Sequence, residues 1–198
     1  VSPLFLSIPF TTSKSLFIIL VTAPELVKGV IFMSKNLKNI TATAMLLALE
    51  IILSRFLSYS VWNSKIGFGF VAVALCGLLF GPVYALILGG LADFLGAVLF
   101  PIGPYFFGFT LTAMLTGLCF GIFLYKKANA LKILLCVFIN QFILGLVVNS
   151  FWIHLLYGTP FSAVLISRIP QSAILLAVQF VTILVLNKLV VPQLKRVL

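Results

Sequence analysis

Apolar residues run almost without interruption over residues 66–125, and this stretch dominates the pattern of the chain. Turn-forming residues break it at 81–82 and at 101–104, and its only charged side chain is Asp93. A helix rises ~1.5 Å per residue and needs ~20 residues to cross a hydrocarbon layer of ~30 Å, so the stretch is long enough for three crossings. The pattern predicts three consecutive membrane helices, with Asp93 inside the middle one.

Further apolar segments on both sides raise the predicted number of membrane helices to six. Thr41 is a suitable N-cap for the first helix, and Pro170 is expected to kink or start the last one. The predicted spans are residues 41–57, 67–80, 82–100, 109–125, 133–156 and 170–191. The connections after spans one, three and five are long and aromatic, and loops of this kind are often functional.

The composition places the chain among membrane proteins. Hydrophobic residues make up 63% of the 198 residues, charged residues make up 8%, and mean hydropathy is +1.29, which leaves too little polar surface for a water-soluble globule of this length. The apolar runs are continuous rather than alternating, which favours helices over a β-barrel. We therefore expect an all-α, multi-pass protein of the cell membrane, folded as a compact six-helix bundle.

The positive charges indicate how the bundle is oriented. The net charge of +10 would suggest nucleic acid in a soluble protein, but these side chains cluster between apolar segments and at the C-terminal end. Because cytoplasmic loops carry an excess of Lys and Arg, the distribution predicts that both termini are cytoplasmic and indicates no nucleic-acid partner. The residues on the predicted cytoplasmic side are Lys35, Lys38, Lys126, Lys127, Lys132, Lys188, Lys195 and Arg196.

Residues 1–32 differ from the rest of the chain. They begin with Val, contain an apolar run too short to span a membrane, and precede Met33, which resembles a second translation start. We expect this upstream segment to stand outside the working fold, which would cover residues 33–198. The alternative is an arm that lies on the membrane surface.

Catalytic and metal sites are not indicated. The three cysteines lie in apolar runs without CxxC spacing, His154 is the only histidine, and the chain has three acidic residues in all. The sequence thus predicts no enzyme, no metal site and no cofactor. It also lacks the phosphate-binding G-x-x-x-x-G-K-[ST] motif, so uphill transport would require partner ATPases.

Polar side chains near the predicted outer ends of the spans favour a small-molecule site. Apolar walls with a few placed polar groups are typical of such pockets. The polar candidates are Arg55, Asp93, Asn149, Arg168 and Gln171, with Lys65 in the first outer loop, and the aromatic candidates are Tyr59, Trp62, Phe68, Tyr105 and Phe106. Three structural interpretations stay open: Asp93 pairs with one arginine to fix helix register, the arginines reach lipid headgroups, and the aromatics form a membrane belt.

Two alanines on the first predicted helix suit a helix–helix contact. Ala44 and Ala48 lie one turn apart, and small residues allow two helices to approach closely in a membrane. They serve either routine packing within the bundle or docking of a separate protein.

A long motif resembles one known family. Residues 67–113 read GFGFVAVALCGLLFGPVYALILGGLADFLGAVLFPIGPYFFGFTLTA, which is similar to the signature of the folate-specific S components of energy-coupling factor (ECF) vitamin transporters. The resemblance extends over about residues 42–190. It implies a membrane subunit that binds folate or a related pterin and associates with a transmembrane coupling subunit and two ATPases.

The resemblance also implies roles for particular residues. In this family an Ala-xxx-Ala pair on the first helix docks on the coupling subunit, which assigns that role to Ala44 and Ala48. In a folate site, Asp93, Asn149 and Gln171 would accept from the pterin, and the aromatic candidates would cover its ring. Arg55 and Arg168, or at least one of them, would bind the glutamate carboxylates, with help from Lys65. Without the resemblance, pyridoxine, thiamin and a purely structural membrane protein remain alternatives.

Overall fold

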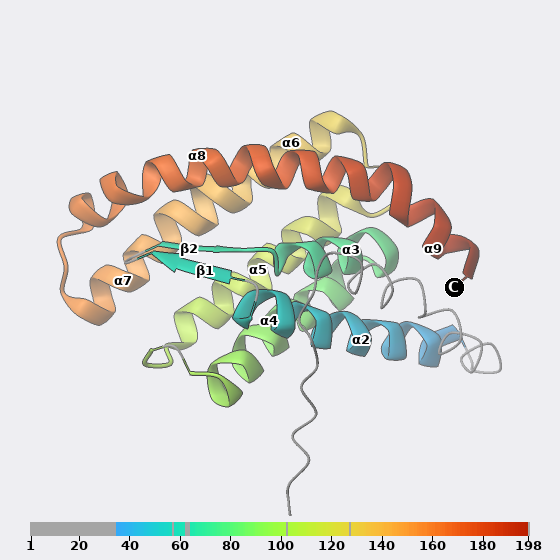
Figure 1. Ribbon diagram of the computed structural model, residues 1–198, viewed down its shortest axis with the longest axis horizontal. Coiled ribbons are helices and arrows are strands. Elements are labelled where there is room, and N and C mark those ends of the chain that lie inside the picture. Colours follow the sequence, from blue (N-terminus) through green and yellow to red (C-terminus); the bar gives the residue numbers. More distant parts are fainter. Residues whose placement is uncertain (1–34, 57, 62–63, 102, 127, 198) are drawn as a thin grey trace, which may run out of the picture. The chain divides into compact units, whose positions relative to one another are not determined.

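A computed structural model of the chain describes residues 35–56, 58–61, 64–101, 103–126 and 128–197 (Figure 1). The chain divides into two units, residues 1–38 and 39–198. The first unit contributes only residues 35–38 to the described part, so the predicted upstream segment lies outside it. The description below concerns residues 39–198.

Six apolar helical segments make up most of the described chain. The first four are α2 (Lys35–Arg55), α3 (Phe70–Phe80), α4 (Pro82–Leu99) and α5 (Phe107–Leu124). The fifth runs without a break through α6 (Ala130–Phe138), the π-helix η2 (Ile139–Val148) and α7 (Asn149–Tyr157). The sixth runs through α8 (Phe161–Val185), η3 (Leu186–Val190) and α9 (Val191–Val197).

Most of these segments are long enough to span a membrane. In the described part of the chain, five helices have the length and hydropathy for a crossing, and α3, with 11 residues, is a shorter apolar helix. The prediction of apolar helices able to cross a membrane is therefore confirmed. The Gly81–Pro82 corner also lies as expected, since α3 ends at Phe80 and Pro82 occupies the first turn of α4.

Two local predictions differ from the structure. The last helix begins at Phe161 rather than at Pro170, and Pro170 lies inside it. A proline removes one backbone donor and crowds the preceding turn, but neighbouring helices can compensate in a membrane bundle. The connection after α2 is also not an irregular loop, because β1 (Ser58–Val61) pairs antiparallel with β2 (Ser64–Gly67).

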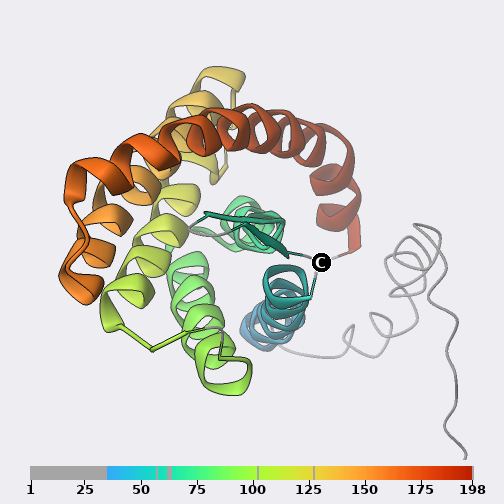
Figure 2. The same cartoon turned by 60° about the vertical axis from the view of Figure 1, so that its left-hand side comes forward.

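The core of the 39–198 unit surrounds α3. Figure 2 shows α3 in the middle of the other helices, and all of its residues from Ala72 to Leu78 are buried. Helices α4 and α5 approach closely because of glycines at their contact: a Cβ at Gly117 would overlap the carbonyl oxygen of Ala85, and one at Gly89 would lie 2.5 Å from the carbonyl oxygen of Ala113. This tight pair forms one wall of the cavities described next.

Candidate ligand-binding site

Two adjoining cavities lie among α2, α3, α4, α5, η2, α7 and α8. Their volumes are about 490 and 220 Å³. Together they fall in the size range of small-molecule sites. They adjoin because six residues line both: Gly67, Phe70, Thr112, Thr116, Asn149 and Arg168.

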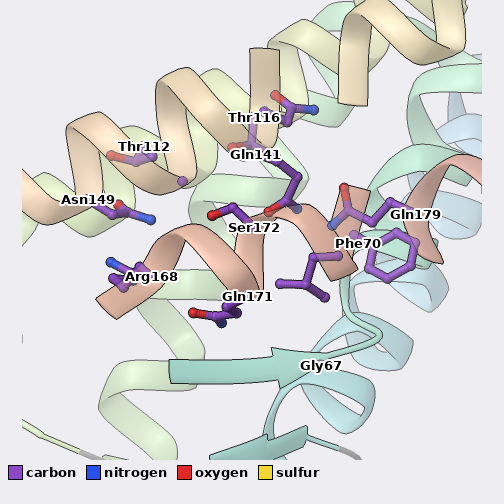
Figure 3. A pocket seen from close by; sticks show the side chains of 13 residues that line it. Gly67, Phe70, Thr112, Thr116, Gln141, Asn149, Arg168, Gln171, Ser172 and Gln179 are labelled. Atoms are coloured by element: carbon purple, nitrogen blue, oxygen red, sulfur yellow. The ribbon is translucent and has the colours of Figure 1, made fainter. Parts of the chain in front are cut away.

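The smaller cavity is polar although the helices around it are apolar (Figure 3). Several of its side chains carry buried atoms that lack a hydrogen-bond partner within the described residues: Asn140 Oδ1, Asn149 Oδ1, Gln179 Oε1 and Arg168 Nη1. Buried polar groups in native proteins nearly always have a partner. Partners for these three acceptors and one donor would come from ordered water or, after a small movement of the side chains, from a polar ligand.

One face of α8 supplies much of this polar lining. Arg168, Gln171, Ser172, Leu175 and Gln179 all line the smaller cavity. Their spacing of three, four, seven and eleven positions from Arg168 is that of one helical face. Because α8 continues through Pro170, Arg168 and Gln179 belong to the same helix and lie about 16 Å apart along it at ~1.5 Å per residue.

Arg168 and Asn149 lie at the same end of the smaller cavity, and Gln179 and Phe70 lie at the other end (Figure 3). The Arg168 end also opens to the larger cavity, because Arg168 and Asn149 line both. The Arg168 guanidinium and the Gln179 acceptor are therefore at opposite ends of the cavity, and the Asn149 acceptor lies at the Arg168 end. Such a distribution suits an elongated ligand with an anionic or carbonyl end and a donor-rich end.

Asp93 is held by a hydroxyl network and lines the larger cavity. Thr110 Oγ1 donates to Asp93 Oδ2 at 2.7 Å, and the Tyr105 hydroxyl lies 3.0 Å from the same Thr110 oxygen. The Tyr105 ring also packs edge-on against Phe94, with ring centroids 5.8 Å apart. In the part of the chain that the structure describes, Asp93 forms no ion pair with Arg55 or Arg168, so nothing here supports the structural-pair interpretation.

Arg55 also lines the larger cavity; one nitrogen of its guanidinium is bonded to α4, and its Nε is buried without a hydrogen-bond partner among the described residues. Nη1 of Arg55 donates to the carbonyl oxygen of Phe100 at 3.3 Å, at the C-terminal end of α4. The guanidinium covers Gly96, where a Cβ would lie 2.7 Å from Arg55 Nε. A cation at a helix C-terminus is favourable, so Arg55 stabilises the α2–α4 contact at the rim of the cavity.

The predicted aromatic residues whose side chains the structure describes, Phe68, Tyr105 and Phe106, do not line the cavities. Phe68 is 46% exposed and packs on Phe70, and it is Phe70 that lines both cavities. Phe106 contacts Trp152, with ring centroids 5.7 Å apart, and Trp152 Nε1 donates to Thr112 Oγ1 at 3.0 Å. Trp62 and the side chains of Tyr59 and Lys65 lie outside the described residues.

Ala44 and Ala48 are exposed on α2. The surrounding apolar residues are exposed as well, including Ile40 at 56%, Met45 at 45% and Ile52 at 47%. Only 6% of the membrane-capable stretch of α2 is buried inside the described structure. The alanines therefore lie on an open apolar face and not in a contact within the bundle.

Sequence reasoning missed several residues of the cavities. Phe70, Asn140, Gln141, Ser172 and Gln179 line the smaller cavity and were not among the candidates. Asn140, Gln141 and Gln179 carry a signal in the sequence, because an uncharged amide inside a membrane span should face a partner or a cavity. The expectation that a helix began at Pro170 separated Arg168 from Gln179 and hid the common face of α8.

Comparisons with known proteins agree with this architecture. Residues 38–187 match the family model described as "ECF transporter, substrate-specific component". A folate transporter FolT from Clostridium novyi (strain NT) is 38% identical over 141 residues, covering 71% of this chain and 82% of the relative. A FolT from Leuconostoc mesenteroides subsp. mesenteroides is 27% identical over 156 residues, covering 75% and 84%. A crystal structure of FolT bound with folic acid superposes with a TM-score of 0.72 at 32% identity, covering 76% of this chain and 92% of that one.

Proposed function

The chain belongs to the family of substrate-specific components of ECF transporters, and from that premise we propose that it binds folate as the membrane subunit of an ECF importer. One observation carries the proposal: this chain has a polar cavity, lined by buried groups without a hydrogen-bond partner among the described residues, and its fold resembles that of a FolT bound with folic acid. The open acceptors suit the donor edge of a pteridine, and Arg168 suits a carboxylate.

The proposed pose places the pteridine in the smaller cavity and the glutamate toward the larger one. Asn149 and Gln171 line the smaller cavity and are candidates for the ring, with Phe70 as its aromatic wall. Asp93 and Arg55 line the larger cavity, and Arg168 stands where the two cavities meet. Further proposed ligand contacts, at the outer opening of the site, are the outer-loop residues Tyr59, Trp62 and Lys65 and the aromatic residues Phe68, Tyr105 and Phe106.

The orientation in the membrane is part of the proposal. The chain would cross six times with both termini in the cytoplasm, because the basic clusters follow the positive-inside distribution. Single cysteines at Lys65 and Lys127, in a background without the native cysteines, should be labelled from opposite sides by an impermeant maleimide. Labelling of both in intact cells would contradict this topology.

The partners would be the transmembrane coupling subunit and two ATPases of the ECF module. The chain carries no phosphate-binding motif of its own, so the energy for uptake must come from other subunits. The open face around Ala44 and Ala48 is the proposed docking surface, because small residues permit close approach of a second helix.

Calorimetric titration of the purified protein tests the ligand. Folate, thiamin and pyridoxine would be added in turn to the same preparation, and folate alone should saturate the protein at one site. Tight binding of thiamin or pyridoxine without folate would overturn the assignment but would leave the family membership intact.

A further inference from the structure

The connection between α5 and α6 lies against the C-terminal part of the last helical segment. α5 and the helical stretch that begins with α6 are both long and apolar enough to cross a membrane, so residues 125–129 lie at the level where two spans end. Nδ2 of Asn187, in η3, donates to the carbonyl oxygen of Ala128 at 3.0 Å. This bond ties η3 to the connection and brings the backbone of Lys188 beside it.

Three exposed lysines belong to this part of the molecule. Lys126 follows the C-cap of α5, Lys132 lies in the first turn of α6, and Lys188 lies in η3. We call these three residues the basic corner. They come from segments about 60 positions apart in the chain, so their position on one surface is a product of the fold.

No carboxylate side chain of residues 39–198 is placed to neutralise the basic corner. The acidic residues of this unit are Glu50 and Asp93, and both line the larger cavity together with Phe70, the first residue of α3. The basic corner lies at the other end of α3, where Gly81 packs on the ring of Tyr125. The positive charges of the corner are therefore left for a partner outside this unit.

The backbone of Lys126 is unusual. Its φ of 66° is in the left-handed region, alone among the non-glycine residues that the structure describes. Glycine adopts this conformation freely, whereas the Cβ of a lysine crowds the following carbonyl oxygen. Nζ of Lys126 lies 5.4 Å from the centre of the Tyr125 ring, within the range of a cation–π contact. A charged side chain thus occupies a position that the backbone alone would give to glycine.

We propose that the basic corner binds the phosphate of an anionic phospholipid such as phosphatidylglycerol. Lysines directly beside membrane spans attract anionic headgroups, by about fivefold in affinity for each lysine at low salt. Exposed apolar side chains next to the lysines suit the acyl chains, which a soluble phosphate compound lacks: Leu131 is 67% exposed and Leu189 is 63% exposed. This inference does not depend on folate binding.

Native mass spectrometry of the purified full-length protein tests the proposal. The protein, in a non-ionic detergent, would be mixed with equal amounts of phosphatidylglycerol and phosphatidylcholine, and the two lipid-bound species would be counted. The wild type should retain phosphatidylglycerol about tenfold or more over phosphatidylcholine. The triple variant Lys126→Gln, Lys132→Gln, Lys188→Gln should lower this preference to within about twofold. No preference in the wild type, or a preference that survives the triple variant, would overturn the proposal.

Two controls separate the corner from general charge and from damage to the fold. The same three positions changed to arginine keep the charge and should keep the preference. Lys65→Gln also removes one positive charge, but from β2, which precedes α3 and so lies at the opposite end of that helix. It should leave the preference unchanged, whereas Lys126→Gln should lower it about fivefold. Equal effects of Lys65→Gln and Lys126→Gln would show a general attraction and no local site.

Asn187→Leu tests whether the fold assembles the corner. It removes the bond to Ala128 without changing the net charge, so it should lower the preference about threefold while all three lysines remain. An unchanged preference would contradict the part of η3 in the corner.

Lys126→Gly separates the charge of Lys126 from its backbone. Glycine relieves the left-handed angle, so the melting temperature should not fall, while the preference for phosphatidylglycerol should fall as in Lys126→Gln. A glycine variant that keeps the full lipid preference would exclude Lys126 from the site.

An acidic protein surface is the competing partner for the same charges. A triple glutamine variant that retains phosphatidylglycerol like the wild type, but no longer copurifies with its transport partners, would assign the corner to a protein contact and refute lipid binding.

Discussion

Replacing Arg168 by alanine should weaken the binding of folate far more than that of pteroate, which lacks the glutamate. Arg168 lines both cavities, and its Nη1 is buried without a hydrogen-bond partner in the described part of the chain. In the described part of the chain, Asp93 forms no ion pair with Arg168 and accepts a hydrogen bond from Thr110. The guanidinium is therefore available to the carboxylates of a ligand.

The size of the effect follows from the chemistry of that contact. Hydrogen bonds to charged groups contribute about 1.5–3 kcal/mol. That range corresponds to a loss of roughly 10- to 150-fold in the affinity for folate. Pteroate lacks both glutamate carboxylates, and its own benzoate carboxylate lies at the position of the amide that joins the glutamate, short of the proposed contact, so its affinity should change by less than about threefold.

Arg55→Ala is the matched control, since it removes the other arginine of the larger cavity. The Arg55 guanidinium donates to the Phe100 carbonyl and covers Gly96, so its loss should lower the melting temperature and weaken both ligands alike. Calorimetric titration of both ligands into both variants gives the four affinities needed. Equal losses of affinity for folate and pteroate in Arg168→Ala would show that Arg168 does not bind the glutamate carboxylates.

Two further predictions test the docking face and the α4–α5 contact. Replacing Ala44 and Ala48 together by tryptophan should abolish folate uptake in cells and leave folate binding to the purified subunit intact. As a control, tryptophan at Val181, which is 59% exposed on α8, should leave both uptake and binding intact. Continued uptake in the double variant would exclude docking at Ala44 and Ala48. Gly117→Ala should lower the free energy of unfolding by about 1–3 kcal/mol, because its Cβ would overlap the backbone of α4, whereas Gly103→Ala, with its nearest atom 3.8 Å away, should change it little. Equal thermal stability of the two glycine variants would refute the close approach.

The sequence by itself determined the class of protein and most of its helices. Hydrophobic length and the position of glycine and proline are local properties, so the ends of α3, α4 and α5 could be predicted to within about three residues. The exposure of Ala44 and Ala48, and the presence of Asn149, Arg168 and Gln171 around one cavity, were also foreseeable. In each case an apolar span contained a small residue, which indicates a helix contact, or a polar residue, which indicates a partner or a cavity.

Only the tertiary structure decided which polar groups meet. Whether Pro170 ends or merely interrupts a helix depends on neighbours that compensate the missing donor, and its inclusion in α8 places Arg168 and Gln179 on one face. The direction of Arg55 toward α4 depends in the same way on packing between segments distant in the chain. Periodicity predicts which residues leave the lipid, but the partner that each one finds is set by contacts between helices.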